Sequence, residues 1–358
     1  MSETATQSTV RVGVAVATGY MGAELLRLLL VHPRVRLTTV MASERSAGTP
    51  VGRLIPSLRD QLPLVVEQVD PERLAAEADC VMLALPYGET HKVVSVLRRH
   101  GRRVIDLSSD YRLRSRAEFE AWYKTVHTDP EGLSEAVYGL PELYRKEIAA
   151  TRLVANPGCY PVGALLAIVP LLKAGLGRPD GIVIDSKSGV TGAGSMSQKP
   201  DPMYLFAEQN ENALAYGVGK HRHTPEIEQA LTGLVGAPVA VTFTPHLVPM
   251  NRGIFTTAYV PLARRTSTAE CLEAYRESYG AEPFVRVLEE GELPRTRAVL
   301  GSNLCDVTVV VEPRTDRAIC LSAIDNLGKG GAANAVQNLN IVHGWDERLG
   351  LTAPPVYP

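Results

Sequence analysis

One cysteine of this sequence has the surroundings of a nucleophile. Cys159 lies in the turn-forming segment 156–161, after an apolar run at 153–155 and before a helical run that starts near Val162. Free backbone N–H groups at the start of a helix lower the pKa of a thiol, because they and the helix dipole favour the thiolate. A buried and unreactive cysteine is the alternative. The order of turn, cysteine and helix favours the nucleophile.

Two histidines at positions i and i+2, His221 and His223, stand directly before a helix that starts with proline. Imidazole gains and loses a proton near neutral pH, so either ring suits general acid–base catalysis beside a thiolate. The pair is a poor metal site, because no third ligand is evident nearby in the sequence. The alternative is a solvated basic loop that caps the helix, with Thr224 and Glu226 as capping and first-turn residues.

A glycine turn follows the first predicted strand, at 10–17, and precedes a helix predicted at 23–31 and a second strand at 35–42. In dinucleotide-binding proteins such a turn brings the pyrophosphate close to the backbone at a helix N-terminus. Gly19 and Gly22 have the required separation, whereas Val16 stands where the motif has its first glycine. An ordinary turn between a strand and a helix is the alternative. The predicted cofactor turn consists of Thr18, Gly19, Tyr20, Met21 and Gly22.

The residues after the second strand indicate which nicotinamide cofactor is bound. Ser43, Arg45 and Ser46 suit the 2′-phosphate of NADP, because an arginine fork and hydroxyl groups bind phosphate oxygens. Glu44 lies among them and could instead bind a free ribose hydroxyl. The sequence therefore favours NADP over NAD.

Three further loops are candidates for ligand binding. Arg112 follows a strand predicted at 104–107, at the edge where open α/β sheets bind ligands, and its planar fork suits a phosphate or a carboxylate. A surface arginine is the alternative. The loops 188–195 and 325–331 are rich in glycine, so they either present backbone N–H groups to a ligand or serve as plain connections.

The composition bounds the class of function. The 358 residues are 45% hydrophobic and carry a formal net charge of −2, which is typical of one large or two ordinary globular domains. The sequence has no excess of basic residues of the kind that indicates nucleic-acid binding. Its longest apolar stretches are too short for a membrane span. Residues 1–9 lack a signal-peptide pattern, and we expect them to form a short tail. The five cysteines include no C-x-x-C pair, which argues against disulfides and zinc and for a reducing cytoplasm.

The order of predicted elements indicates two domains. Strands at 80–85 and 104–107 with a helix at 89–100 continue the first alternation, which predicts a doubly wound α/β domain. After a helix at 162–172, few helices interrupt the predicted strands, so we expect an α+β domain with a mostly antiparallel sheet. A final helix at 330–343 is expected to pack on the first domain. The predicted domains are 1–157 with 326–358 and 158–325, and the later strands are 181–187, 239–245, 253–260, 307–311 and 318–324.

Taken together, these segments resemble the N-acetyl-γ-glutamyl-phosphate reductases, relatives of aspartate-semialdehyde dehydrogenase. The resemblance covers nearly the whole chain. The segments around Cys159 and the two histidines are specific, and the glycine turn is not. The chain departs from the family's pattern at Val16 and at Val162, where the family usually has threonine. The matching segments are 18–25, 85–88, 109–113, 138–142, 156–161, 188–194, 219–227 and 323–330.

The resemblance implies a Rossmann domain that binds NADP(H) and a catalytic domain like that of glyceraldehyde-3-phosphate dehydrogenase. We also expect a homo-oligomer, either a dimer or a tetramer, because an exposed sheet in the second domain suits contact with another copy. The resemblance places the nucleophile at Cys159 and the acid–base histidine at His221, with His223 as the second choice. It implies a substrate and phosphate site made of Arg112, Asn156, Ser188 and Gly189. To the cofactor site it adds Pro86, Gly192 and Asn326.

The implied reaction is the NADPH-dependent reduction of a small acyl phosphate, N-acetyl-γ-glutamyl phosphate, to its semialdehyde through a Cys159 thioester, in arginine biosynthesis. The resemblance implies no metal. Three alternatives remain open at this point. They are a sister reductase of carrier-bound aminoadipyl phosphate in lysine biosynthesis, a phosphorylating aldehyde dehydrogenase of another pathway such as that of aspartate semialdehyde, and a non-catalytic NADP-binding regulatory protein.

Overall fold

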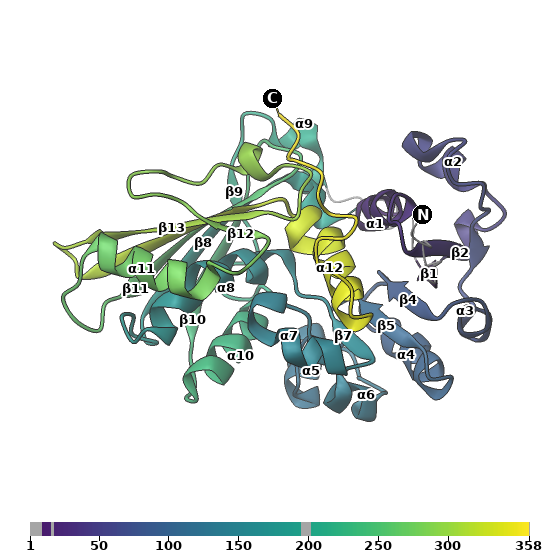
Figure 1. Cartoon of the computed structure of the whole chain (residues 1–358), viewed down its shortest axis with the longest axis horizontal. Helices are drawn as coiled ribbons and strands as arrows, with labels where there is room; N and C mark the ends of the chain where they lie inside the picture. The colour runs from purple at the N-terminus through teal and green to yellow at the C-terminus, as the bar shows by residue number, and fades with distance from the viewer. Residues whose placement is uncertain (1–8, 16–17, 195–201, 358) are drawn as a thin grey trace, which may run out of the picture. The chain divides into compact units, whose positions relative to one another are not determined.

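The chain folds into two units in the computed structural model, which describes residues 9–15, 18–194 and 202–357 (Figure 1). One unit consists of Met1–Asn156 with Ala332–Thr352, and the other consists of Pro157–Gly331 with Ala353–Pro358. The glycine turn and Arg112 therefore belong to the first unit, whereas Cys159 and both histidines belong to the second.

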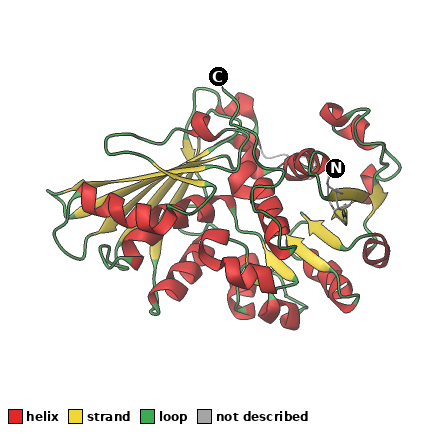
Figure 2. Ribbon diagram, in the orientation of Figure 1, coloured by secondary structure: helices red, strands yellow, loops and turns green. Residues whose placement is uncertain are grey.

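Among the described residues, seven parallel strands form the sheet of the first unit (Figure 2). In order across the sheet they are β3 (Glu67–Gln68), β2 (Val35–Ala42), β1 (Val10–Ala15), β4 (Cys80–Leu83), β5 (Arg103–Asp106), β7 (Leu153–Ala155) and β6 (Val137–Tyr138). The central strands are apolar runs that are almost entirely buried, which is typical of a parallel sheet with helices on both faces. The strand order reverses between β1 and β4, as in doubly wound dinucleotide-binding folds.

Helices connect these strands, and several begin at a side-chain cap. Asp70, Ser115 and Asp129 accept backbone N–H groups at the starts of three of them, as N-cap residues do. The final helix, α12, packs on α1 and α7 within this unit. The α-helices are α1 (Tyr20–Leu30), α2 (Val51–Leu54), α3 (Pro71–Glu77), α4 (Thr90–Arg99), α5 (Arg116–Tyr123), α6 (Pro130–Glu135), α7 (Pro141–Ala150) and α12 (Ala333–Val342), and the 3-10 turns are η1 (Glu44–Ser46) and η2 (Pro56–Leu58).

The described part of the second unit also contains a sheet of seven strands. In order they are β12 (Val285–Val287), β13 (Cys305–Glu312), β14 (Arg317–Ile324), β11 (Ile254–Pro261), β8 (Ile182–Ser188), β10 (Val241–Leu247) and β9 (Leu214–Ala215). Four of the neighbouring pairs are antiparallel and two are parallel. Burial alternates along β8, as expected for a sheet with one covered face. The prediction of an α/β part followed by a mostly antiparallel α+β part is confirmed.

Helices pack on one face of this second sheet. The first of them, α8 (Cys159–Lys173), is apolar nearly all round and is buried between the sheet and two other helices, α10 (Thr224–Val235) and α11 (Thr268–Tyr279). Its buried position fixes the place of its first residue, Cys159. The remaining elements are α9 (Phe206–Gln209), the 3-10 turns η3 (Val190–Ala193), η4 (Pro202–Tyr204) and η5 (Thr296–Val299), and a π-helical turn, η6 (Gly328–Ala332).

Several predicted boundaries differ from the structure. The helix expected from Val162 starts at Cys159, because Gly158 is extended and Pro161 fits the first helical turn, where its missing N–H costs no intrahelical bond. The last helix starts at Ala333 instead of Gly330, after η6. Helices α5, α6 and α7 were not predicted, since each has at most ten residues and shows little periodicity.

The end of the strand predicted at 10–17, including Val16, lies outside the described residues. Within the described ranges, no helix combines the length and the apolar character needed to span a lipid bilayer.

Candidate active site

Cys159 is the first residue of α8, and Gly158 before it is the extended N-cap (φ −68°, ψ 151°). The first N–H groups of a helix have no intrahelical partner, so the thiol lies at the positive end of the helix dipole. Cys159 is half-buried, whereas the other four cysteines are buried. Burial raises the pKa of two of these, Cys80 and Cys320, to about 12, which keeps them as thiols at neutral pH. The structure therefore distinguishes Cys159 from the other cysteines by its helix position and its exposure.

A carboxylate from α10 holds the backbone immediately before the cysteine. Glu226 lies in the first turn of α10 and is 1% exposed. Its Oε1 accepts a hydrogen bond from the backbone N–H of Gly158, with 2.7 Å between the two heavy atoms. The bond fixes the start of α8 against the start of α10. From the sequence, Glu226 is only a first-turn residue, because no local pattern shows that its partner lies 68 residues away.

His223 packs directly on the glycine that precedes Cys159. A Cβ atom added to Gly158 would lie 2.4 Å from Nε2 of His223, so only glycine fits at this position. The imidazole edge that carries Nε2 therefore faces the residue next to the thiol. The backbone N–H of His223 donates to Nδ1 of His221 at 3.2 Å, which links the two histidines.

His221 lies in an aromatic surrounding. Its ring centroid is 5.5 Å from those of Tyr160 and Tyr216 and 5.4 Å from that of Phe243. Burial, with a smaller effect of the Arg222 charge, lowers the pKa of His221 to about 4. The ring is therefore neutral at physiological pH, and its Nδ1 is engaged by the backbone of the loop.

Two tyrosine hydroxyls lie near the thiol. The hydroxyl oxygens of Tyr160 and Tyr216 are 2.8 Å apart. Burial raises the pKa of both side chains, and a Cys159 thiolate raises both further, so the hydroxyls stay protonated. Neither hydroxyl therefore supplies a base at neutral pH.

The two glycine-rich loops of the second unit meet near β8. The Nδ2 of Asn326 donates to Oγ1 of Thr191 at 3.0 Å, and a Cβ at Gly192 would lie 2.9 Å from Oγ of Ser188. The neighbouring Gly189 packs against a backbone carbonyl, 2.5 Å from the position of a Cβ. The structure thus brings together the predicted residues Ser188, Gly189, Gly192 and Asn326.

The loop 325–331 also reaches the cysteine. A Cβ at Gly330 would lie 2.9 Å from Cβ of Cys159. Asp325, which is fully buried, holds this loop by accepting the N–H of Leu327 at 2.9 Å and that of Gly328 at 3.2 Å, and it pairs with Arg252 at 2.9 Å. Asp325 is a supporting residue that the glycine pattern of the sequence did not single out.

In the first unit, the candidates for cofactor binding follow neighbouring strands. The turn Thr18–Gly22 follows β1, Ser43 to Ser46 follow β2, and Pro86 follows β4, so all lie after the carboxyl ends of adjacent parallel strands. The N-cap of α1, Gly19, is extended, and no side chain of the described residues caps the helix. Ser43 and Arg45 are exposed. A bare helix N-terminus beside exposed hydroxyl and guanidinium groups fits a dinucleotide with an added phosphate.

The described structure gives Arg112 and Asn156 different surroundings. Arg112 donates from Nε to the carbonyl oxygen of Asn156 and from Nη2 to that of Leu107, both at 2.9 Å. The Asn156 side chain is 1% exposed, and its Oδ1 accepts from the amides of Asn334 at 2.9 Å and Asn338 at 3.1 Å, both in α12. Arg112 is thus held at the ligand edge of the sheet, and Asn156 is a buried link to α12.

A search for clusters of three or more His, Cys, Asp or Glu side chains able to hold a metal ion finds none in the described ranges.

Two family models match the two parts of the chain. Residues 11–151 match the semialdehyde dehydrogenase NAD-binding domain, and residues 159–326 match the semialdehyde dehydrogenase dimerisation domain. The first match identifies a domain for a nicotinamide cofactor.

Relatives named N-acetyl-γ-glutamyl-phosphate reductase match along nearly their whole length. The protein from Geobacter metallireducens is 49% identical over 348 residues, which is 97% of this chain and 99% of the relative. The protein from Symbiobacterium thermophilum is 49% identical over 352 residues, or 98% of this chain and 100% of the relative. That from Geotalea daltonii is 50% identical over 349 residues, with coverages of 97% and 99%.

Among solved structures, aspartate semialdehyde dehydrogenase II from Vibrio cholerae has a TM-score of 0.73 at 19% identity and covers 94% of this chain and 99% of its own. The aspartate semialdehyde dehydrogenase with NADP from Candida albicans has a TM-score of 0.65 at 17% identity, with coverages of 93% and 100%. At these identities the similarity shows the fold. With both units matched and half of all residues shared with full-length relatives, this chain belongs to the N-acetyl-γ-glutamyl-phosphate reductases of the semialdehyde dehydrogenase family.

Proposed function

We propose that this chain reduces N-acetyl-γ-glutamyl phosphate with NADPH to N-acetyl-glutamate 5-semialdehyde, with release of inorganic phosphate, as a step of arginine biosynthesis. The name shared by the relatives supports the substrate. The observation that carries the chemistry is the position of Cys159 at the start of α8, with the His223 ring packed on the glycine before it.

The first half of the reaction uses Cys159 as a nucleophile. His223 takes the thiol proton, and the thiolate attacks the acyl carbon of the substrate. The bond between this carbon and the phosphate oxygen breaks, and inorganic phosphate leaves with the electron pair, so that a thioester remains on Cys159. We assign stabilisation of the developing oxyanion to the positive end of the α8 dipole, where Cys159 lies.

In the second half the thioester is reduced. The start of α1 and the residues after β2 would hold NADPH, which would supply the hydride for reduction of the thioester to a hemithioacetal. His223 gives its proton to the carbonyl oxygen as the hydride adds and removes it again as the carbon–sulfur bond breaks, which releases the aldehyde and restores the thiolate.

We assign the acid–base role to His223 and a supporting role to His221, the reverse of the order of preference drawn from the sequence. The Nε2 of His223 faces the residue next to the thiol, whereas Nδ1 of His221 accepts a backbone N–H and its ring is enclosed by aromatic side chains. The low pKa of His221, about 4, suits a neutral residue that positions the loop.

For the ligands, we propose NADP as the cofactor, with its 2′-phosphate on Ser43, Arg45 and Ser46 and its pyrophosphate at the start of α1. The exposed hydroxyl and guanidinium groups after β2 support this choice. We also propose Pro86 in the first unit, and Gly192 and Asn326 in the second unit, as cofactor-binding residues. For the substrate and its phosphate, we propose Arg112 in the first unit, held by the backbone carbonyl of Asn156, and Ser188 and Gly189 in the second unit.

We propose that the chain forms a homo-oligomer and acts on a small-molecule substrate in the cytoplasm. We keep the two domains predicted from the sequence, which are residues 1–157 with 326–358 and residues 158–325. Residues 159–326 match a dimerisation domain. Val183, Tyr259, Ile319 and Val310 lie side by side across β8, β11, β14 and β13, and Tyr259 and Val310 are each 37% exposed. Such an apolar row on a sheet suits contact with a second copy.

The reverse reaction tests the proposal. NADP⁺ reduction is followed by absorbance with N-acetyl-glutamate semialdehyde, with and without inorganic phosphate. Turnover that requires phosphate supports the proposal. Turnover without phosphate contradicts the acyl-phosphate chemistry, and activity only with the aminoadipyl analogue contradicts the substrate. The Cys159→Ser variant is the control, and we expect it to bind NADPH but to lose nearly all turnover.

A further inference from the structure

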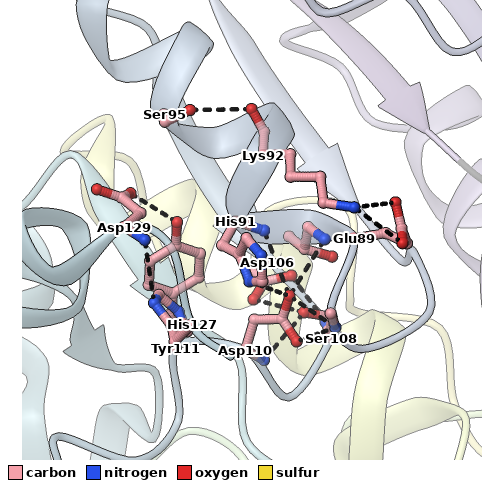
Figure 3. A network of polar contacts seen from close by, with 12 residues as sticks. Glu89, His91, Lys92, Ser95, Asp106, Ser108, Asp110, Tyr111, His127 and Asp129 are labelled. Atoms are coloured by element: carbon pink, nitrogen blue, oxygen red, sulfur yellow. Dashed lines mark hydrogen bonds and ion pairs between the residues drawn. The ribbon is translucent and has the colours of Figure 1, made fainter. Parts of the chain in front are cut away.

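A buried carboxylate lies behind two loops of the first unit that we propose to bind ligands (Figure 3). Asp110 follows β5 and is 0% exposed. Its oxygens accept the backbone N–H groups of Gly88 at 2.9 Å, Thr90 at 3.1 Å and His91 at 3.3 Å. All three donors lie in the loop after β4 or in the first turn of α4. Asp110 therefore caps α4 from a different loop of the chain.

The loop that Asp110 holds is shaped by an unusual backbone conformation. Gly88 has a φ of +84°, and a Cβ there would lie 3.2 Å from a methyl carbon of Thr125. The N-cap of α4, Glu89, makes no side-chain capping bond in the described structure. Pro86, two residues before Gly88, is exposed at the carboxyl end of β4. The Asp110 carboxylate thus satisfies the backbone donors that fix this loop.

The same residue also fixes the loop that carries Arg112. The N–H of Asp110 donates to Oγ of Ser108 at 3.2 Å, and Ser108 donates to Asp106 from N and from Oγ, both at 2.8 Å. Two residues after Asp110, the Arg112 guanidinium is held by the carbonyl oxygens of Leu107 and Asn156. A displacement of Asp110 would therefore be transmitted along this short loop to Arg112.

A pair of buried histidines lies on one side of the carboxylate. The Nδ1 of His91 lies 3.4 Å from Oδ2 of Asp110, and the rings of His91 and His127 are 4.8 Å apart. Both histidines are at most 1% exposed. In such a water-poor site, a buried N–H that loses its acceptor pays its full desolvation penalty, so the neutral amide of asparagine would be a poor replacement for the carboxylate.

We infer that Asp110 is a positioning residue that couples the Pro86 loop to Arg112, so that one side chain sets the affinity for both the nicotinamide cofactor and phosphate. The inference rests on the proposed function, since it takes Pro86 as a cofactor residue and Arg112 as a phosphate residue.

The test is the variant Asp110→Asn. The Kd of NADPH and the KM of inorganic phosphate should each rise by about tenfold, the effect of losing one charge-assisted bond to the loop. The kcat should change by less than about threefold, because Cys159 and His223 belong to the other unit. The iodoacetamide alkylation rate of Cys159 should stay unchanged. A rise in only one of the two constants, or in neither, overturns the inference.

Asp306→Asn is the control. Asp306 is also a buried carboxylate, 3% exposed, but it lies in the second unit and accepts from Nε of Arg286 at 2.6 Å. We expect its loss to lower the Tm and to leave both constants unchanged. If Asp110→Asn lowers only the Tm, as this control does, then Asp110 is merely structural and the inference is wrong.

Gly88→Ala disturbs the same loop and keeps the carboxylate, so it serves if Asp110→Asn does not fold. We expect the Kd of NADPH and the KM of phosphate to rise together in this variant as well. A change in only one of the two constants overturns the coupling. Titration of NADPH and of phosphate by direct binding keeps the two proposals separate. If the wild-type chain shows no phosphate-dependent turnover, the proposed function fails, whereas the paired Kd values still decide the role of Asp110.

Discussion

At the residue scale, tertiary surroundings give different properties to residues of the same type. His221 and His223 are two positions apart, but the His221 ring is enclosed by aromatic side chains while Nε2 of His223 faces Gly158. The cysteines differ in the same way, because Cys159 starts a helix and is partly exposed whereas burial raises the pKa of Cys80 to about 12. Reactivity here is a property of the site more than of the residue type.

We predict that His223→Asn lowers kcat by about a hundredfold or more, because a general acid–base group is lost. His221→Asn should lower kcat by a smaller factor. It should also keep the shape of the pH profile of kcat, since the pKa of His221, about 4, leaves this ring neutral over the working range. Steady-state rates across the pH range check both. A larger loss in His221→Asn than in His223→Asn would reverse the assignment.

At the element scale, the starts of two helices build the catalytic centre. The N-cap of α10 is His223, its first turn provides Glu226, and the first residue of α8 is Cys159. The Glu226 bond to Gly158 joins these helix ends. Both helix N-termini are the positive ends of their helix dipoles, and both lie at this centre.

We predict that Glu226→Ala lowers kcat by about tenfold to a hundredfold, since the N–H of Gly158 loses its buried acceptor and Cys159 shifts relative to His223. Glu226→Gln keeps an acceptor oxygen without the charge, so it should recover part of this loss and lower the pH at which iodoacetamide alkylates Cys159. Glu228→Gln on the same helix, where the carboxylate accepts the N–H of Val241 at 3.0 Å, is the control. Equal effects at both positions would contradict a specific role of Glu226.

A second prediction at this scale concerns the loop after β5. Burial, and next the Asp110 charge, raise the pKa of Asp106 from 3.8 to about 7. Because its pKa is raised, Asp106 binds its proton more tightly in the folded state than in the unfolded state. This tighter binding contributes fully to the free energy of unfolding below pH 3.8, and the contribution is lost as the pH rises through 7. The loss amounts to ~4 kcal/mol, at 1.36 kcal/mol per pKa unit.

Asparagine at position 106 cannot titrate, so the Tm of Asp106→Asn should rise relative to the Tm of the wild type between pH 5 and pH 8. This range extends about one to two pH units on either side of the pKa of Asp106. Thermal unfolding in matched buffers measures this difference. A difference that stays constant over this range would show that Asp106 does not titrate there.

At the scale of the whole molecule, two units with different sheets divide the proposed work. The parallel sheet of the first unit places its loops at one edge, as cofactor-binding folds do, and the mixed sheet of the second supports the cysteine helix on one face. Its other face carries the apolar row of Val183, Tyr259, Ile319 and Val310.

We predict that Tyr259→Asp together with Val310→Asp shifts the chain toward the monomer, because two charges in an apolar contact are costly to desolvate. Light scattering after size exclusion, over a dilution series, measures the mass. Val31→Asp in the first unit, at a residue that is 67% exposed, is the control and should leave the mass unchanged. If the double variant keeps the mass of the wild type, this row is not the contact surface.

The sequence by itself determined much of this protein. Local order along the chain predicts the strands, the glycine turn after β1 and the turn that leads into the helix of Cys159, because backbone preferences and apolar periodicity act over a few residues. It also showed which loops follow strand ends and so lie at the ligand edge of the first sheet. The family resemblance then connected these segments with a reaction.

The tertiary structure alone decided which distant groups meet. Glu226 bonds to a glycine 68 residues earlier, Asp110 caps a helix from another loop, and Asn156 turns inward to α12. The difference between the two histidines is of the same kind, since it depends on Gly158, Tyr160 and Tyr216 packing around them. Burial and long-range bonds arise from the packing of whole elements, which no local pattern of residues specifies.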